Sequence, residues 1–351
     1  MLIYLYLLIL FAIAAFVLKN DKFGLICIIV LFIIVIFRGE TVGSDTSNYI
    51  RRGLPDFVDG MKTQQFIYAF LTSIMTPPSH LLIVTFAIIS FWGIYVSSKK
   101  FEVRPAAAFF FFIIFEHFNL SLNIARQYAA AGILMIAYTF LFEQGRKRYL
   151  FFPMVVLAFG FHSSSLICLP LYFCRNIDFS KIKVWVIALF FAVAYASYHL
   201  VLKDYYLTIV HAFELSQDME VYSMYFNEAD DADLSLGGVI IARSMPILSM
   251  YIFIVLSRIK TDKVKIITSL FFVSIIMDIF FSELYGNIGR IRFCVNIINV
   301  IAYSYYFLKI RDKYKIIVAP AVIVLFGYSF IHLIMGYAYQ TTPYKFDFWL
   351  F

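Results

Sequence analysis

The chain has 351 residues, of which 62% are hydrophobic and only 15% are charged, and its net charge is +7. This composition excludes an ordinary soluble domain, because apolar stretches recur along the whole chain and leave no soluble domain of useful size. The positive charge does not indicate nucleic-acid binding, since most of the excess lies in links that set membrane topology.

Apolar segments that can enter a membrane as helices follow one another from end to end of the chain. We predict about twelve of them, near 2–18, 23–37, 81–97, 105–118, 128–142, 149–161, 164–174, 184–202, 237–257, 266–281, 293–308 and 316–337. The pair around His162 is short for a straight crossing and is expected to be broken or tilted. The expected fold is an all-α polytopic membrane protein with one integral membrane domain over 1–351.

The links between these segments alternate in character. One set holds 19 of the 29 lysines and arginines, and 13 of the 19 are lysine. Positive-inside bias places this set in the cytoplasm, in a cytoplasmic (inner) membrane protein with both chain ends outside. The set comprises 19–22, 99–104, 146–148, 175–183, 258–265 and 309–315.

The opposite set holds ten cations, and seven of them are arginine. Exposure to solvent does not favour arginine over lysine. The planar guanidinium of arginine, in contrast, can form two hydrogen bonds to a carboxylate or a phosphate. We therefore expect the outer face to carry the function. The seven are Arg38, Arg51, Arg52, Arg126, Arg243, Arg290 and Arg292.

Two outer loops are long. The loop 38–80 contains an apolar stretch, 65–75, that is too short to span and is expected to be interfacial or re-entrant. The loop 203–236 is acidic and rich in tyrosine, and its run Asp230–Asp233 lacks the spacing of a calcium-binding loop. The four cysteines lie in or beside apolar segments and are read as packing residues. We expect no metal and no cofactor.

The first polar constellation follows directly on an apolar segment and runs from Arg38 through Gly43 and Asp45 to Tyr49. Its glycines allow a tight turn at the membrane surface, although a solvated loop with Asp45 as a helix cap is an equal reading. The second combines Asn119, Asn123, Arg126 and Gln127. Their helical spacing predicts one helix face of amide and guanidinium donors, with hydrogen bonding between helices as the alternative.

The third constellation is the outer turn at His162, which could supply a base or a hydrogen bond, although a lone histidine is more often structural. The fourth is the pair Arg290 and Arg292 at the start of an apolar segment. Snorkelling explains one arginine there more readily than two. Arg243 also enters an apolar segment, which indicates a cavity or an acidic partner such as Asp278.

In this order the motifs resemble those of the EpsG-type polysaccharide polymerases, which are relatives of the Wzy O-antigen polymerases. The resemblance covers almost the whole chain apart from 203–236. Its residues are Arg38-Gly-x-x-x-Gly43-x-Asp45-Thr46-x-x-Tyr49, Ser121-Leu-Asn123-x-x-Arg126-Gln127, Phe161-His162-Ser163-Ser164, Arg290-x-Arg292 and Pro343-Tyr344-Lys345-Phe346.

The resemblance implies a multi-span glycosyltransferase of the GT-C type that builds O-antigen, capsule or exopolysaccharide. Such polymerases act on oligosaccharide repeat units carried by undecaprenyl pyrophosphate. They transfer the growing glycan to the next lipid-linked unit on the outer side of the cytoplasmic membrane. The expected partners are these lipid-linked units, membrane lipids and a chain-length regulator protein.

The chemistry of that reaction assigns roles to the outer residues. Arginines stabilise the leaving pyrophosphate, for which we select Arg126, Arg290 and Arg292, with Arg38 and Arg243 as second choices. A base takes the proton of the acceptor hydroxyl, and Asp45 is the first candidate and His162 its rival. The remaining residues expected to contact substrate, the tyrosines by stacking on sugars, are Tyr49, Asn123, Gln127, Tyr285 and Tyr344.

Two other functions remain open. A ligase or other single-addition glycosyltransferase would use the same architecture but add one unit per acceptor. A flippase or exporter would need charged residues along a path to the inner side, whereas here they gather at the outer face.

Overall fold

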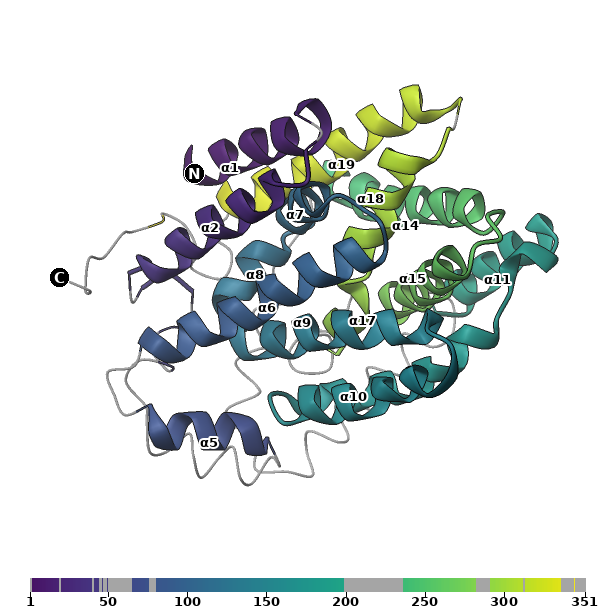
Figure 1. Cartoon of the computed structure of the whole chain (residues 1–351). Helices are drawn as coiled ribbons and strands as arrows, with labels where there is room; N and C mark the ends of the chain where they lie inside the picture. The colour runs from purple at the N-terminus through teal and green to yellow at the C-terminus, as the bar shows by residue number, and fades with distance from the viewer. Residues whose placement is uncertain are drawn as a thin grey trace, which may run out of the picture.

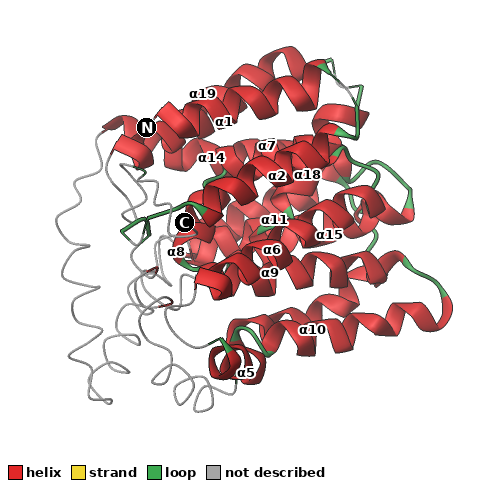
Figure 2. Ribbon diagram, turned by 60° about the vertical axis from the view of Figure 1, so that its left-hand side comes forward, coloured by secondary structure: helices red, strands yellow, loops and turns green. Residues whose placement is uncertain are grey.

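The computed structural model describes residues 2–18, 20–39, 41–43, 46, 49, 65–75, 80–198, 236–281, 291–311, 313–335 and 344. Every regular element in these ranges is a helix, which confirms the all-α prediction. The helices pack side by side in one bundle (Figures 1 and 2).

Each predicted apolar segment coincides with helical structure. The principal elements are α1 (Leu2–Ala12) with its π-helical extension η1 (Ile13–Val17), α2 (Phe23–Ile36), α5 (Phe66–Ile74), α6 (His80–Lys100), α7 (Pro105–Ile114), α8 (His117–Asn123), α9 (Ala125–Thr139), α10 (Phe151–Phe159), the 3-10 helix η4 (Ser163–Asn176), α11 (Val184–Ser197), α14 (Leu236–Leu256), α15 (Asp262–Phe281), α17 (Phe293–Asn296), α18 (Asn299–Lys309) and α19 (Lys315–Met335). Short 3-10 turns η2 (Phe140–Phe142), η3 (Gly145–Leu150) and η5 (Phe179–Lys181) lie in the links.

The number of membrane crossings is a separate question from the number of helices. Within the described ranges, three helices are long and apolar enough to cross a membrane, namely His80–Lys100, Asp262–Phe281 and Lys315–His332. The pair α7 and α8, bent by 72°, makes a fourth if it counts as one span. The other apolar helices are shorter, so the structure supports several spans and does not establish twelve.

Two helices at the centre of the bundle, α6 and α9, cross at glycines (Figure 1). A Cβ added to Gly93 would lie 2.1 Å from the carbonyl oxygen of Gly132, and one added to Gly132 would lie 2.7 Å from that of Ile89. Small residues let helix backbones approach closely where lipid provides no hydrophobic driving force. This crossing therefore sets the spacing of the helices around it.

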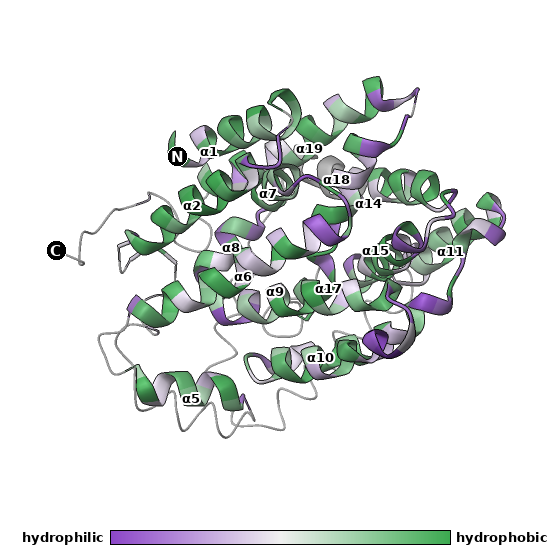
Figure 3. Cartoon of the chain, in the orientation of Figure 1, coloured by the Kyte–Doolittle hydropathy of each residue, from purple (hydrophilic) through white to green (hydrophobic). Residues whose placement is uncertain are grey.

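The described residues of the two sets of links lie at opposite ends of the bundle. At one end, which we call the lysine end, the Nζ of Lys263 lies 2.6 Å from the Oε1 of Glu102 and that of Lys265 lies 3.7 Å from the Oδ2 of Asp178. The hydrogen bond from Lys263 lowers the pKa of Glu102. Figure 3 shows the hydrophilic links gathered there. We call the opposite end, where α2 finishes and α9 begins, the arginine end.

Two elements that were expected to be too short for a straight crossing are short in the structure, while their tilt or interfacial position stays a prediction. The pair around His162 consists of the nine-residue α10 and the 3-10 helix η4, which contains Pro170. The stretch 65–75 forms the nine-residue α5, which is too short to span. α5 docks on the arginine end, because the amides of Ile67 and Tyr68 both donate to the carbonyl of Gly160, at 2.9 and 3.0 Å. These bonds satisfy donors that the first turn of a helix leaves open.

Candidate functional site

The loop after α2 is tied to α8. The Nη1 of Arg38 donates to the carbonyl of Leu122 at 2.8 Å, and the hydroxyl of Thr46 lies 3.5 Å from the same oxygen. Gly43 has φ +87°, and a Cβ there would lie 2.5 Å from that carbonyl oxygen. Only glycine meets both requirements, so the loop and α8 form one unit.

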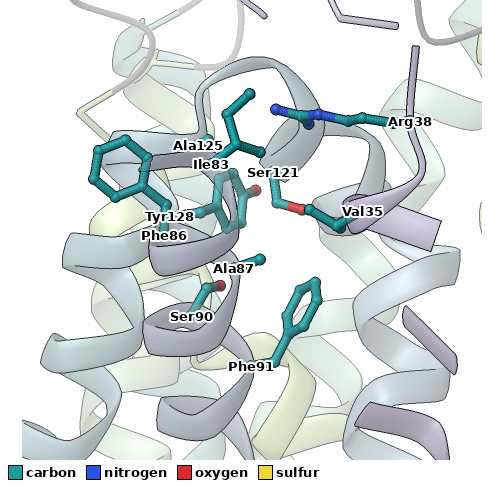
Figure 4. Close-up of a pocket in the computed structure, with 10 residues that line it drawn as sticks. All are labelled: Val35, Arg38, Ile83, Phe86, Ala87, Ser90, Phe91, Ser121, Ala125 and Tyr128. Atoms are coloured by element: carbon teal, nitrogen blue, oxygen red, sulfur yellow. The ribbon is translucent and has the colours of Figure 1, made fainter. Parts of the chain in front are cut away.

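Arg38 itself is enclosed, with 1% of its surface exposed. Figure 4 shows its side chain reaching from the end of α2 toward Ser121 and Ile83. The cavity beside it measures about 10 Å³, room for no more than one water molecule. Its Nε and Nη2 have no hydrogen-bond partner within the described part of the chain. In this arrangement Arg38 anchors the loop, and the described residues around it enclose its side chain.

Two tyrosines near Arg38 make contacts within the protein. Tyr49 is buried and meets the ring of Phe86 edge to face at 5.8 Å. The hydroxyl of Tyr344 donates to the carbonyl of Ile34 at the end of α2. This contact brings the last family-like motif next to the first.

The second motif is divided by a break in the helix. Ile124, with φ −96° and ψ 53°, separates α8 from α9. Asn119 and Asn123 are buried on α8, whereas Arg126 and Gln127 lie in the first turn of α9. The prediction of one continuous helix face is therefore wrong, because the chain leaves helical dihedrals between its two halves.

Arg126 stacks on α5. Its guanidinium carbon lies 4.2 Å from the ring centroid of Tyr68, a cation–π geometry. Among the described residues no carboxylate is within ion-pair distance of it, and its Nε has no hydrogen-bond partner. The residue is partly exposed. Arg126 therefore keeps a positive charge that an anion could neutralise.

Arg292, in contrast to Arg126, is paired with a carboxylate. Its Nη1 lies 3.4 Å from the Oδ1 of Asp278, and the amide of Asn296 donates to the same oxygen at 2.5 Å. Ser274 donates to Asn296 at 3.0 Å and to Asn299 at 2.7 Å. The side chains of Arg292 and Asp278 are 24% and 35% exposed, so this ion pair reaches the surface.

A second carboxylate lies close to Arg292. Glu116 stands at the bend between α7 and α8 in a left-handed conformation, φ 67°, which is unfavourable for a side chain with a Cβ. Its Oε1 accepts from the hydroxyl of Ser329 on α19 at 2.7 Å, and its charge interacts with that of Arg292. Next to it, the Nδ1 of His117 lies 2.7 Å from the hydroxyl of Tyr128.

Sequence reasoning missed this arrangement. It considered Asp278 only as a partner for Arg243, and it gave Glu116 no role. The available signal was an ionisable residue inside or at the end of an apolar segment, which holds for both carboxylates.

His162 caps the helix that follows it. Its Nδ1 lies 2.7 Å from the hydroxyl and 3.3 Å from the amide of Ser164 in the first turn of η4. That hydroxyl lies 3.1 Å from the Sγ of Cys294, which also accepts from the side-chain amide of Gln127 at 3.9 Å. Residues of the second and third motifs therefore meet at one buried thiol, which lies two residues after Arg292 in the sequence.

Cys294 resembles the other cysteines in its burial. All four are buried and free, as expected of packing residues. Within the described ranges, no group of three or more histidine, cysteine, aspartate or glutamate side chains is placed to hold a metal ion.

Several residues expected at the site lie outside the described residues: Asp45, Tyr285 and Arg290. The same holds for the side chain of Arg243, whose backbone belongs to α14. Their roles stay predictions.

The docking of α5 can be tested at Gly160. A Cβ there would lie 2.6 Å from the Cγ1 of Ile67 and 2.9 Å from the Cζ of Phe66, so we expect Gly160→Val to displace α5. A cysteine placed at the buried Thr72 should then become reactive to a water-soluble maleimide. Gly327→Val is the matched control, because nothing lies within 4 Å of a Cβ at Gly327. Equal protection of the cysteine in both variants would contradict the docking.

The chain matches a known family over most of its length. A family model described as the EpsG family matches residues 21–346, which is nearly the whole chain. No curated protein and no solved structure matches it. The matched range includes the loop after α2, both halves of the second motif, the His162 turn, Arg292 and Tyr344. The apolar helices and this match indicate a multi-pass membrane protein, and the chain belongs to the EpsG family.

Proposed function

We propose that the protein polymerises lipid-linked oligosaccharide repeat units of a surface polysaccharide. In this proposal it is a glycosyltransferase of GT-C-like architecture with about twelve membrane spans, located in the cytoplasmic (inner) membrane with its site on the outer face. It transfers the growing glycan from undecaprenyl pyrophosphate to the next lipid-linked unit. O-antigen is the product class that we favour, and a chain-length regulator is the expected protein partner.

The observation that carries the proposal is the meeting of the family-like motifs at the arginine end. The loop at Arg38 binds Leu122, and Tyr344 binds the end of α2. Gln127 and Ser164 meet at Cys294, two residues from Arg292. A one-sided site of this kind favours a transferase over an exporter, which needs polar residues along a path between both ends.

The reaction breaks the bond between the anomeric carbon of the donor glycan and the pyrophosphate oxygen. A hydroxyl of the acceptor unit forms the new bond and loses its proton to a base. The pyrophosphate leaves on its lipid and carries the negative charge. No redox step is involved, and the energy comes from the donor itself.

Arginines at this end are suited to the leaving group, because a guanidinium fixed in advance stabilises charge as it develops. Arg126 needs no exchange of an ion-pair partner, since Tyr68 is the contact that its guanidinium makes among the described residues. Arg292 must exchange its contact with Asp278 for the pyrophosphate, and Arg290 is the third member. Asp45 remains the proposed base. The capping contact of His162 with Ser164 favours a structural role for that residue.

A genetic experiment tests the proposal. A strain without this gene should accumulate a saccharide of single repeat units, and the intact gene should restore the ladder of polymer lengths. Complementation by Asp45→Ala or Arg126→Ala should fail although the variant reaches the membrane in normal amount. A full ladder from both variants would refute the site assignment, and a full ladder in the deletion strain would refute the function.

A further inference from the structure

The ion pair between Arg292 and Asp278 uses only part of the guanidinium. The Nη1 of Arg292 lies 3.4 Å from the Oδ1 of Asp278, whereas charge-assisted hydrogen bonds between nitrogen and oxygen are about 2.7–2.9 Å long. The Nε of Arg292 has no hydrogen-bond partner within the described ranges. Both side chains are partly exposed, and ion pairs that reach the surface contribute little to stability. The fold therefore does not require that this pair stay closed.

The carboxylate of Asp278 is held in place without the arginine. The side-chain amide of Asn296 donates to its Oδ1 at 2.5 Å. The hydroxyl of Ser274 lies 3.0 Å from the amide oxygen of Asn296, which leaves the amide nitrogen directed at Asp278. Asp278 lies near the end of α15, and Asn296 is the last residue of α17, which packs against α15. Arg292 can therefore turn away while the carboxylate keeps its position.

A second carboxylate adds negative charge at this point. Glu116 accepts a hydrogen bond from Ser329, and its charge interacts with that of Arg292. Its left-handed backbone, φ 67°, is unfavourable for a residue with a Cβ and persists only where the surrounding structure fixes it. Among Glu116, Asp278 and Arg292, two carboxylates thus share one guanidinium, and the negative charge exceeds the positive.

The proposed reaction raises the negative charge of the diphosphate. When the bond from the anomeric carbon breaks, the diphosphate oxygen keeps the electron pair and becomes part of a terminal phosphate. The second proton of a terminal phosphate dissociates at about pH 6, so the free lipid diphosphate carries roughly one more negative charge than the donor. Fixed carboxylates beside the diphosphate therefore repel the product more strongly than the donor.

We propose that Asp278 is a positioning residue that competes with undecaprenyl diphosphate for Arg292 and thereby promotes release of this product after each transfer. Arg292 contacts the diphosphate during transfer and returns to Asp278 as the product leaves, while Glu116 adds to the repulsion. The proposal rests on the proposed function and deepens it, because a polymerase must release one lipid diphosphate for every unit that it adds.

Direct binding tests this role without the need for turnover. Undecaprenyl diphosphate and its terminal methyl ester, which lacks the additional ionisable oxygen, are titrated against the full-length protein in nanodiscs of constant lipid composition. Asp278→Asn keeps the shape of the side chain and removes its charge. It should tighten the binding of undecaprenyl diphosphate roughly tenfold and that of the methyl ester roughly threefold, because repulsion of the extra charge is relieved only for the former.

Two further proteins show whether Asp278 acts through Arg292. In the background of Arg292→Ala, Asp278→Asn should tighten the binding of undecaprenyl diphosphate only about threefold, because the competition is absent and repulsion alone remains. Asp262→Asn is the matched control. It removes the same charge from the first turn of the same helix, at the lysine end, where the carboxylate lies 3.8 Å from the Nζ of Lys265. It should change neither affinity.

Turnover supplies a readout that a merely structural role would not produce. Asp278→Asn should lower both kcat and KM for the lipid-linked repeat unit, because binding tightens while release slows. Added undecaprenyl diphosphate should inhibit this variant at lower concentrations than it inhibits the native protein. A loss of kcat with an unchanged or higher KM would contradict a role in release.

Equal affinity of Asp278→Asn and the native protein for undecaprenyl diphosphate would overturn the proposal, as would an equal gain with and without Arg292. Asp278→Ser, measured in the same way, decides the matter if Asp278→Asn does not fold. Failure of the proposed function is a distinct result. In that case no polymer forms from a lipid-linked repeat unit, while the gain in affinity of Asp278→Asn and its dependence on Arg292 persist.

Discussion

Replacing Arg292 with alanine is expected to abolish polymer formation while the protein still reaches the membrane. The change removes a guanidinium that is paired with Asp278, whose carboxylate also accepts a hydrogen bond from Asn296, at the arginine end. Loss of one preorganised donor to a developing negative charge slows a reaction by roughly 10²–10³-fold. The measurement is the rate of polymer formation by purified protein, together with the ladder in complemented cells.

Two further variants show whether the effect belongs to the site. Arg175→Ala removes an arginine of the lysine end, where its guanidinium lies over the ring of Tyr172, and should retain full activity. Arg292→Lys keeps the charge but loses the planar fork and should show an intermediate rate. A full ladder from Arg292→Ala at normal expression would exclude Arg292 from the reaction.

Replacing Gly93 with valine is expected to be the most damaging single change to the fold. The new Cβ would lie 2.1 Å from the backbone oxygen of Gly132, and a backbone atom cannot move aside as a side chain does. Overpacking of this kind costs about 3 kcal/mol or more. We expect a midpoint of thermal unfolding that is lower by roughly 4 °C and a reduced amount of protein in the membrane.

Gly327→Val on α19 is again the matched control, because it adds the same side chain where no atom lies within 4 Å. Its unfolding temperature should equal that of the native protein. If Gly93→Val and Gly327→Val unfold at the same temperature, the close crossing of α6 and α9 does not exist as described.

Hydropathy was sufficient to locate the helices of this chain but not their breaks. All the predicted apolar segments are helical, because long apolar runs leave few alternatives in a membrane. No proline marks the bend at Glu116 or the break at Ile124. Both positions fall within polar stretches whose spacing predicts a continuous helix. The dihedral angles at these two residues depend on how α8 packs against its neighbours, which no local pattern contains.

The candidate site was predictable in its parts and not in its contacts. The preference for arginine selected Arg126 and Arg292, and the structure places both at one end of the bundle. Their different surroundings come from residues distant in sequence, since Tyr68 of α5 faces one and Asp278 of α15 the other. For Arg38 the prediction and the structure differ. Its motif is typical of a loop at the membrane surface, whereas its side chain is enclosed against α8.

Polymerisation by this protein can be tested directly with the purified protein reconstituted in lipid. The purified protein in lipid is given a synthetic repeat unit on undecaprenyl pyrophosphate, and the products are separated by length on a gel. We expect a ladder that extends by one repeat unit per step and the release of one undecaprenyl pyrophosphate per bond formed. A product that stops after a single addition, or no product at all, would contradict this expectation.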